Sequence, residues 1–183
     1  DGPEDLLDVK RMFVPVGQYE LEISFQDVHD ANNTAAFTSP LAVNLSVGAH
    51  LSEILLLRSY RPDNSESPFT KNGYFLEPLP FRYYDRTTTM LAFYAEIYHS
   101  GKVVKGDSYL VRYLIEQDLG NGKMELISVG NQNKKPSAID AVLVPIGISK
   151  MKSGNYVLTV ELRNETNELL ASRQVSFQRS NPF

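Results

Sequence analysis

The side chains best suited to metal binding or acid–base chemistry lie far apart in this sequence. The three histidines are His29, His50 and His99, and none forms a His-Glu-x-x-His pattern or another closely spaced ligand pair. His29 is flanked by Asp27 and Asp30, and calcium prefers clustered oxygen ligands of this kind. The spacing does not match a calcium-binding loop, and acidic turn residues usually face water. We therefore expect neither a metal site nor a bound cofactor.

Two short segments formally match motifs of catalysis or phosphate binding. Ser149 and Lys152 have the Ser-x-x-Lys spacing, in which lysine activates a serine when both lie on one helical turn, but no companion motif accompanies them. Gly120–Lys123 is rich in glycine yet lacks the strand–loop–helix setting of a phosphate cradle. The chain has no cysteine, which excludes a cysteine nucleophile and thiolate zinc sites. We predict that the chain is not an enzyme; a hydrolase site assembled from distant residues is the remaining alternative.

The segment 81–86 is the best candidate for a recognition surface. It reads Phe-Arg-Tyr-Tyr-Asp-Arg, and aromatic rings can stack on sugars or peptides while charged groups fix the orientation. Tyrosine is also common in strands, where one residue of each alternating pair faces the core. Two interpretations stay open: an ordinary strand, or a carbohydrate- or peptide-binding patch near Tyr83 and Tyr84.

Composition and charge indicate a folded chain that does not bind nucleic acid. Hydrophobic residues make up 42% and charged residues 22% of the 183 residues, close to the average of globular proteins. The net charge is −4, whereas a protein that neutralises phosphates needs a basic face. No apolar run approaches the roughly 20 residues that span a bilayer. We therefore expect no nucleic-acid partner and no transmembrane segment in this chain.

Two segments near opposite ends of the chain share an alternating pattern that begins with tyrosine. Gly17–Gln26 and Gly154–Arg163 each place Tyr, Leu, Ile or Val, and a further apolar residue on one face. Because side chains alternate along a strand, each segment is predicted to have one buried face, and the turn residues that follow predict a hairpin. Tyr19 and Tyr156 are expected to bury their rings and to hydrogen-bond nearby backbone, as in the tyrosine corner of sandwich folds.

The positions of these two hairpins predict two related domains, of which the first is incomplete. The offset from Gly17 to Gly154 is much longer than the roughly 20–50 residues of a solenoid repeat. We predict a partial domain at 1–46, formed by C-terminal strands and their hairpin, and a complete sandwich domain at 47–183. A two-stranded piece is marginal alone, so we expect the first strands to pack on the following domain or to pair with a second copy.

The segments between the hairpins predict further short strands. Leu51–Tyr60 matches both alternation and helical spacing, so its pattern is ambiguous. The other candidates are Gly73–Leu79, Met90–Tyr98, Tyr109–Gln117, which has the pattern of a central strand, and Met124–Val129. Strands separated by regular turns favour an antiparallel sandwich over a βαβ fold. The predicted fold class is all-β: an immunoglobulin- or fibronectin-III-like antiparallel β-sandwich preceded by the last strands of a second, incomplete sandwich.

Four parts of the sequence together resemble a known family. They are Ser67–Tyr74, Leu91–Tyr98, Ser153–Tyr156, and Leu169–Arg173 with Phe177–Pro182. They are similar to recurrent segments of bacterial (Bacteroidetes-type) GWxTD domain-containing envelope proteins. The resemblance implies immunoglobulin-like domains ahead of a mostly helical region with the Gly-Trp-x-Thr-Asp motif. That motif is absent here because the chain has no tryptophan, so the resemblance implies the β-rich part of a longer protein.

These observations lead to one expected function and one alternative. We expect a non-catalytic interaction or spacer module of a larger bacterial envelope protein, located outside the cytoplasm as a secreted, periplasmic or outer-membrane-associated chain. Its expected partners are other domains of its own longer chain, and another protein or a second copy bound through the N-terminal strands. The alternative is a carbohydrate- or peptide-binding module that uses the aromatic patch near Tyr83 and Tyr84.

Overall fold

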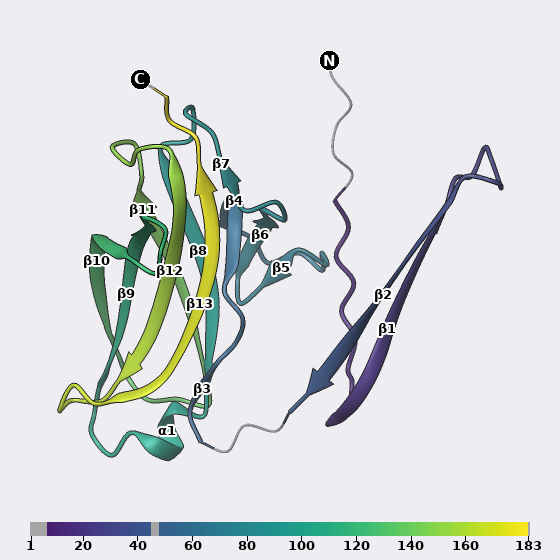
Figure 1. Ribbon diagram of the computed structural model, residues 1–183. Coiled ribbons are helices and arrows are strands. Elements are labelled where there is room, and N and C mark those ends of the chain that lie inside the picture. The colour runs from purple at the N-terminus through teal and green to yellow at the C-terminus, as the bar shows by residue number, and fades with distance from the viewer. Residues whose placement is uncertain (1–6, 45–47, 183) are drawn as a thin grey trace. The chain divides into compact units, whose positions relative to one another are not determined.

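The computed structural model describes residues 7–44 and 48–182 and divides the chain into two compact units, Asp1–Ser46 and Val47–Phe183. Figure 1 shows that strands form almost all of the regular structure in both. The predicted all-β class is confirmed. In the part of the chain that the structure describes, no helix has the length and apolar character needed to cross a membrane.

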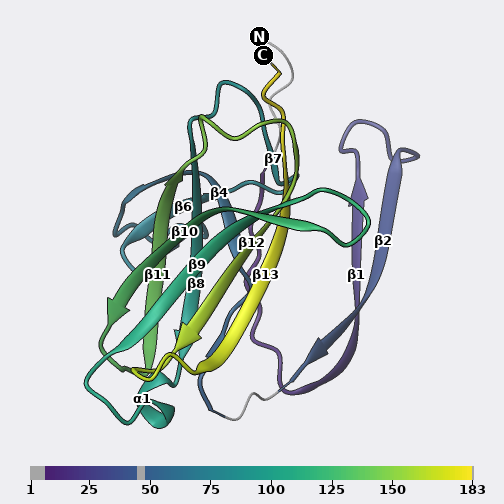
Figure 2. The ribbon, with the colours of Figure 1, turned by 60° about the vertical axis from the view of Figure 1, so that its left-hand side comes forward.

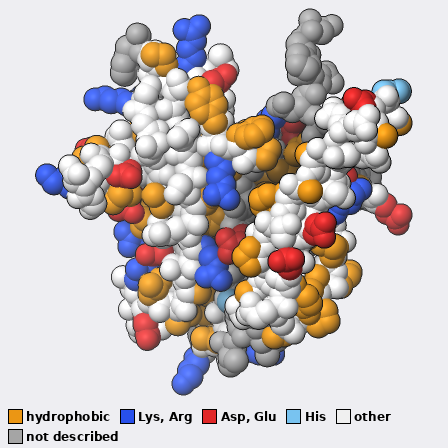
Figure 3. Space-filling model, turned by 45° about the vertical axis from the view of Figure 1, so that its right-hand side comes forward, with side chains coloured by type: hydrophobic (Ala, Val, Ile, Leu, Met, Phe, Trp, Pro, Cys, Tyr) orange, Lys and Arg blue, Asp and Glu red, His pale blue; other side chains and the backbone are white. Residues whose placement is uncertain are grey.

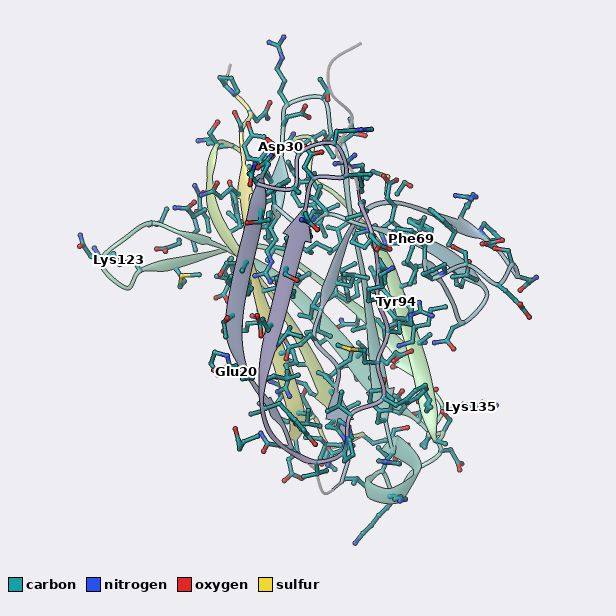
Figure 4. The ribbon with its side chains drawn as sticks, turned by 90° about the vertical axis from the view of Figure 1, so that its right-hand side faces the viewer. Glu20, Asp30, Phe69, Tyr94, Lys123 and Lys135 are labelled. Atoms are coloured by element: carbon teal, nitrogen blue, oxygen red, sulfur yellow. The ribbon has the colours of Figure 1, made fainter. Side chains whose placement is uncertain are left out.

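The first unit contains a two-stranded antiparallel ribbon. Strands β1 (Gly17–Gln26) and β2 (Thr34–Val43) pair in continuous register, from Gly17 opposite Val43 to Gln26 opposite Thr34. Asp30 lies in the turn at the tip of this ribbon (Figure 4). The alternation in the sequence predicted β1, because its apolar residues all lie on one face of the strand. The apolar face was predicted to be buried, but in the structure it is exposed: Ile23 is 37% and Phe25 is 65% exposed.

The second unit has two sheets, visible as facing layers in Figure 2. The first sheet has the order β10 (Met124–Lys134), β9 (Tyr109–Asp118), β12 (Gly154–Arg163), β13 (Leu169–Arg179) and β7 (Tyr83–Tyr84). Its pairs are antiparallel except for β13 and β7, which run parallel. Strand β9 lies between two neighbours, as its doubly apolar pattern predicted.

The second sheet has the order β11 (Ile139–Gly147), β8 (Met90–Tyr98), β4 (Leu55–Pro62), β6 (Tyr74–Pro78) and β5 (Thr70–Lys71), and β3 (His50–Leu51) also pairs with β8. A four-residue helix, α1 (Ser100–Val103), follows β8. The inward side chains of both sheets form one core, in which Phe93, Ile97, Ile115 and Leu158 are fully buried. This core holds the sheets face to face.

The ambiguous segment Leu51–Tyr60 folds as two strands with a break between them rather than as one element. At the break, the Ser52 hydroxyl accepts a hydrogen bond from Glu96 N at 2.9 Å, and Ser52 N donates to Glu96 O at 2.8 Å. A side chain therefore replaces one backbone acceptor of the sheet, as serine often does. Strands β5 and β11 were not predicted, and β7 lies within 81–86, where a strand was one of the two interpretations. Strand β10 continues five residues beyond the predicted Val129, to Lys134.

Candidate functional site

The predicted aromatic patch borders a surface hollow of about 290 Å³. The hollow is lined by Arg58, Leu79, Tyr83, Tyr84, Asp85, Thr87 and Thr88. The Tyr83 side chain is 47% exposed and the neighbouring Phe81 is 76% exposed, whereas Tyr84 is only 2% exposed. Of the two candidate tyrosines, Tyr83 is therefore available to a ligand and Tyr84 belongs to the core.

Tyr84 is buried because β7 adds to the edge of β13 and turns alternate side chains inward. Its ring meets the Phe177 ring edge-on, with the ring centroids 5.6 Å apart. Burial raises the pKa of the Tyr84 hydroxyl above its ordinary value, and among the residues that the structure describes this hydroxyl has no hydrogen-bond partner. Tyr84 therefore acts as a neutral core residue at any ordinary pH.

A buried arginine holds the loop that forms the rim of the hollow. Arg179 is 3% exposed, and its Nη1 donates to Thr88 O at 2.8 Å and to Asp85 O. The Asp85 carboxylate accepts hydrogen bonds from Thr87 N at 3.0 Å and from the Thr87 hydroxyl at 2.7 Å. Hydrogen bonds from Thr87 and Thr88 lower the pKa of Asp85. The hollow thus combines the Tyr83 ring, Arg58 from β4 and the ionised Asp85 carboxylate. Arg179 holds the loop that carries Asp85.

The most concentrated group of polar side chains surrounds Glu96, on the outer face of β8. Glu96 is 3% exposed. Its Oε1 accepts hydrogen bonds from the Tyr94 hydroxyl at 2.7 Å and from Asn72 Nδ2 at 2.9 Å. Its Oε2 accepts from Lys71 Nζ at 2.7 Å and from the Tyr98 hydroxyl. We call these five residues the Glu96 cluster; Figure 4 marks Tyr94 among them.

Strand and turn geometry together assemble the Glu96 cluster. Tyr94, Glu96 and Tyr98 are two residues apart on β8 and so share one face. The other two residues come from the tight hairpin between β5 and β6, where Asn72 and Gly73 have φ angles of 48° and 81°. Two positive φ angles in a two-residue loop define a type I′ turn, for which Asn-Gly is a preferred sequence.

The electrostatics of the cluster favour an ionised Glu96 beside neutral tyrosines. Burial by itself raises the pKa of Glu96, but hydrogen bonds from Lys71, Tyr98 and Tyr94 outweigh it and lower the pKa below its ordinary value. Burial and the Glu96 carboxylate raise the pKa of Tyr98 to about 12 and also raise that of Tyr94. A carboxylate with four donors and a lowered pKa is a poor proton acceptor. The cluster therefore fastens the hairpin to the sheet.

A second polar group consists of the half-buried Asp140 and the buried residues Tyr109 and Ser100. The Asp140 carboxylate accepts from the Tyr109 hydroxyl at 2.6 Å and from the Ser100 hydroxyl at 3.0 Å. The Ser100 hydroxyl also accepts from Ser137 N at 2.9 Å, and Ser100 is 0% exposed. Burial and Asp140 raise the pKa of Tyr109. These contacts join α1, β9 and β11, and the serine is inaccessible to a substrate.

The residues considered as metal ligands act as turn caps. Asp27 Oδ1 accepts from His29 N at 2.8 Å, and Asp30 Oδ1 accepts from Asn32 N at 3.0 Å. His50 Nδ1 lies 3.2 Å from Gly48 O, and its ring stacks on Tyr98 with a centroid distance of 5.1 Å. Within residues 7–44 and 48–182, no three His, Cys, Asp or Glu side chains are grouped so that they could hold a metal ion.

The two formal motifs do not have the geometry that their chemistry requires. Ser149 lies in a turn, and the segment to Lys152 contains no helix; the Lys152 carbonyl instead accepts the Tyr156 hydroxyl at 2.9 Å. Gly120–Lys123 connects β9 to β10, with positive φ at its first three residues, so it forms a turn between strands. Lys123 lies at the tip of this hairpin (Figure 4).

Sequence reasoning identified the exposed aromatic patch but missed the Glu96 cluster. The alternation of Met90–Tyr98 places Tyr94, Glu96 and Tyr98 on the polar face, where a solvated surface is the ordinary interpretation. The pair Asn72-Gly73 could have predicted the hairpin. No local pattern predicts that the hairpin tip contacts a residue 24 positions later in the chain.

Comparisons with known proteins give no family for this chain. No protein family and no curated protein sequence matches it. Two solved structures, both of β-glucosidase from Kluyveromyces marxianus, match with TM-scores of 0.31 and 0.30 at 9% sequence identity. The first, a complex with glucose, aligns with 75% of this chain and the second, a Se-Met labelled form, with 69%. The chain spans 14% and 15% of those proteins.

Proposed function

We propose that the chain is a non-catalytic interaction or spacer module, built on an immunoglobulin-like sandwich, of a larger bacterial envelope protein. The strand order supports the sandwich type. Strands β4, β8 and β11 correspond to strands A, B and E of that architecture, and β10, β9, β12 and β13 correspond to C′, C, F and G. The Tyr156 hydroxyl bonds to a carbonyl four residues upstream at the start of β12, as in a tyrosine corner.

One observation carries the non-catalytic assignment. In two polar clusters, around Glu96 and around Asp140, the carboxylates already accept hydrogen bonds from neighbouring elements, and Glu96 itself is buried. An acid–base or nucleophilic site needs a group that is accessible and poised near neutral pH. Here four donors occupy both oxygens of Glu96, and the Tyr109 and Ser100 hydroxyls donate to Oδ2 of Asp140, so both clusters act in holding the fold together.

The extracytoplasmic location is proposed on the sequence resemblance to envelope proteins, and other domains of the same longer chain are the proposed partners. We expect the full-length gene product, tagged and expressed in a bacterium, to fractionate with the envelope or periplasm. We also expect no turnover in a screen of glycosidase, esterase and peptidase substrates. A cytosolic product would contradict the location. Turnover that is lost in Glu96→Gln, with folding intact by circular dichroism, would contradict the non-catalytic role.

A carbohydrate- or peptide-binding role is the second candidate, and the hollow beside Tyr83 supports it. Its volume of about 290 Å³ lies at the lower end of ligand sites, which suits one sugar ring or one side chain. We expect any glycan-array or peptide-array signal to disappear in Tyr83→Ala and to persist in Tyr60→Ala, an exposed tyrosine that borders a different hollow. The absence of signal for the wild type, or equal signal in both variants, would refute this role.

A further inference from the structure

The ribbon formed by β1 and β2 has one strongly apolar face. Alternation places Tyr19, Leu21, Ile23 and Phe25 on this face of β1, and Phe37 lies opposite Ile23 on β2. Phe25 is 65% exposed, Phe37 is 58% exposed and Ile23 is 37% exposed. The two phenylalanines alone leave on the order of 200 Å² of ring surface uncovered. Hydrophobic side chains at the molecular surface are orange in Figure 3.

The β1–β2 ribbon repeats the strand pairing that the β12–β13 hairpin has from Gly154 to Leu162; after Leu162 the second hairpin has a register shift that the first lacks. In the first ribbon Gly17, Tyr19 and Ile23 pair with Val43, Leu41 and Phe37. In the second hairpin, Gly154, Tyr156 and Val160 have the equivalent positions and pair with Arg179, Phe177 and Arg173. Both hairpins therefore begin with Gly-x-Tyr and present an apolar face made of every second residue.

The two leading tyrosines also make the same hydrogen bond. The Tyr19 hydroxyl donates to Pro15 O at 3.0 Å, and the Tyr156 hydroxyl donates to Lys152 O at 2.9 Å. Each acceptor lies four residues upstream of its tyrosine. The two hairpins share their strand pairing and the hydrogen bond of the leading tyrosine. We interpret them as two copies of one structural unit.

What differs between the hairpins is the cover over the apolar face. Tyr156, Leu158, Val160 and Leu162 are at most 1% exposed, because they pack in the core between the two sheets of the second unit. Strand β12 also pairs on its other side with β9, whereas β1 and β2 form a sheet of two strands. The first ribbon thus has an apolar face and a strand edge that correspond to those covered in the second unit by the opposite sheet and by β9.

We propose that the apolar face of the β1–β2 ribbon is half of a second sandwich core, and that its occupant is an antiparallel β-sheet with alternating apolar side chains. This inference rests on the proposed sandwich module and specifies its partner. The occupant is a sheet of the type formed by β4, β8 and β11, which supplies the opposite half of the same interface in the second unit. A strand equivalent to β9 pairs antiparallel with the edge of β1 away from β2, an edge that pairs with no strand within residues 7–44 and 48–182.

The charge of the ribbon determines which face receives this sheet. Glu20 and Glu22 lie on the opposite face of β1, together with Gln18, Ser24 and Gln26. Burial of unpaired carboxylates is costly, so the acidic face stays in water and the occupant covers the Tyr19–Phe25 face. Such a partner brings inward-facing Leu, Ile, Val and Phe side chains and needs no complementary charge.

Hydrogen–deuterium exchange tests this proposal, with β12 as the internal reference for a covered strand. We would compare the 183-residue chain with the full-length product of its gene, each at low and high protein concentration. We expect the β1 amides between Tyr19 and Phe25 to exchange rapidly in the 183-residue chain. In the full-length product we expect exchange at least about 100-fold slower, approaching β12.

Matched variants of the full-length product identify the covered face. Phe25→Asp is expected to restore fast exchange in β1 and to leave β12 unchanged, whereas Glu22→Gln on the opposite face leaves both unchanged. Fast β1 exchange in both proteins would refute the proposal, since the face would then have no occupant. Slow β1 exchange in the 183-residue chain would refute the proposal too. If the exchange is slow at both protein concentrations, residues of the same 183-residue chain cover the apolar face. If it is slow only at high concentration, a second copy of the chain covers it.

The exchange experiment and the tests of the proposed function can fail independently of each other. A cytosolic location or a catalytic activity would overturn the envelope-module assignment and leave the protection of β1 as predicted. Conversely, an unprotected β1 in an envelope-located, inactive protein would overturn the second sandwich core alone.

Discussion

Replacement of Glu96 by glutamine tests whether the Glu96 cluster stabilises the second unit. The carboxylate accepts four hydrogen bonds, from Tyr94, Asn72, Lys71 and Tyr98. Glutamine keeps an acceptor oxygen for two of these donors but turns an amide NH₂ toward the Lys71 ammonium, which is also a donor. The substitution therefore removes the ion pair and at least one charge-assisted hydrogen bond without creating a cavity.

The expected cost is about 2–3 kcal/mol at neutral pH. Hydrogen bonds to charged groups contribute about 1.5–3 kcal/mol each, and the loss of a buried carboxylate also relieves its desolvation. The Lys71 side chain is 42% exposed, so its ammonium regains water and reduces the penalty. For a domain of this size, we expect the melting temperature to fall by roughly 10 °C.

The dependence on pH has a defined sign. Because the pKa of Glu96 is lowered in the folded state, its stabilisation is complete above the unfolded pKa, about 4.3. It is lost as the pH falls through the folded pKa. The difference in unfolding free energy between the wild type and Glu96→Gln should therefore be largest at neutral pH and shrink below about pH 4.

Urea denaturation followed by tyrosine fluorescence measures this difference, since nine of the ten tyrosines lie in residues 47–183. Glu77→Gln is the control: Glu77 is a half-buried carboxylate that accepts the Ser59 hydroxyl at 2.6 Å and lies 3.8 Å from Arg58. We expect the control to change stability by less than about 1 kcal/mol. Equal midpoints for Glu96→Gln and the wild type at neutral pH would show that the cluster does not hold the hairpin.

Two further substitutions test other features of the second unit. Tyr156→Phe should lower the unfolding free energy by about 1 kcal/mol because the Lys152 carbonyl loses its donor; an unchanged urea midpoint would contradict this. Gly130→Ala should cost roughly 1–3 kcal/mol, since an added Cβ lies 2.3 Å from the Tyr113 ring. Gly147→Ala, where no atom lies within 4 Å of the added Cβ, should change thermal stability little, and equal losses in both alanine variants would refute the steric explanation.

Local alternation predicted strands in which apolar side chains recur at every second residue. Gly17–Gln26 and Met90–Tyr98 were predicted with the bounds that β1 and β8 have in the structure. The corner hydrogen bonds of Tyr19 and Tyr156 were also predicted and are confirmed. The predicted burial of the ring holds for Tyr156, which is 1% exposed, but is wrong for Tyr19, which is 38% exposed. The confirmed features depend on neighbours within a few residues, and a single sequence contains that information.

Features that depend on contacts between segments far apart in the sequence could not be predicted in the same way. In β8 the polar face holds Glu96, which the pattern assigns to water, yet this side chain is 3% exposed. It is buried because the type I′ turn at Asn72 and Gly73 brings the β5–β6 hairpin over it. For 81–86 the pattern stated that one tyrosine is core but not which one, since the register of β7 against β13 decides it.

The Glu96 cluster also limits where the second unit can bind a partner. Lys71 and Asn72 use their side chains to bond Glu96, so the outer face of β8 is partly covered from within the unit. A partner that displaced the β5–β6 hairpin would leave the buried Glu96 carboxylate without the donors Lys71 and Asn72. The free-energy cost of this loss is larger than the free energy gained from a typical surface contact. We therefore expect any partner of this unit to bind at a surface that needs no such displacement. The hollow beside Tyr83 is one, because its loop is held by Arg179 whether or not a ligand is bound.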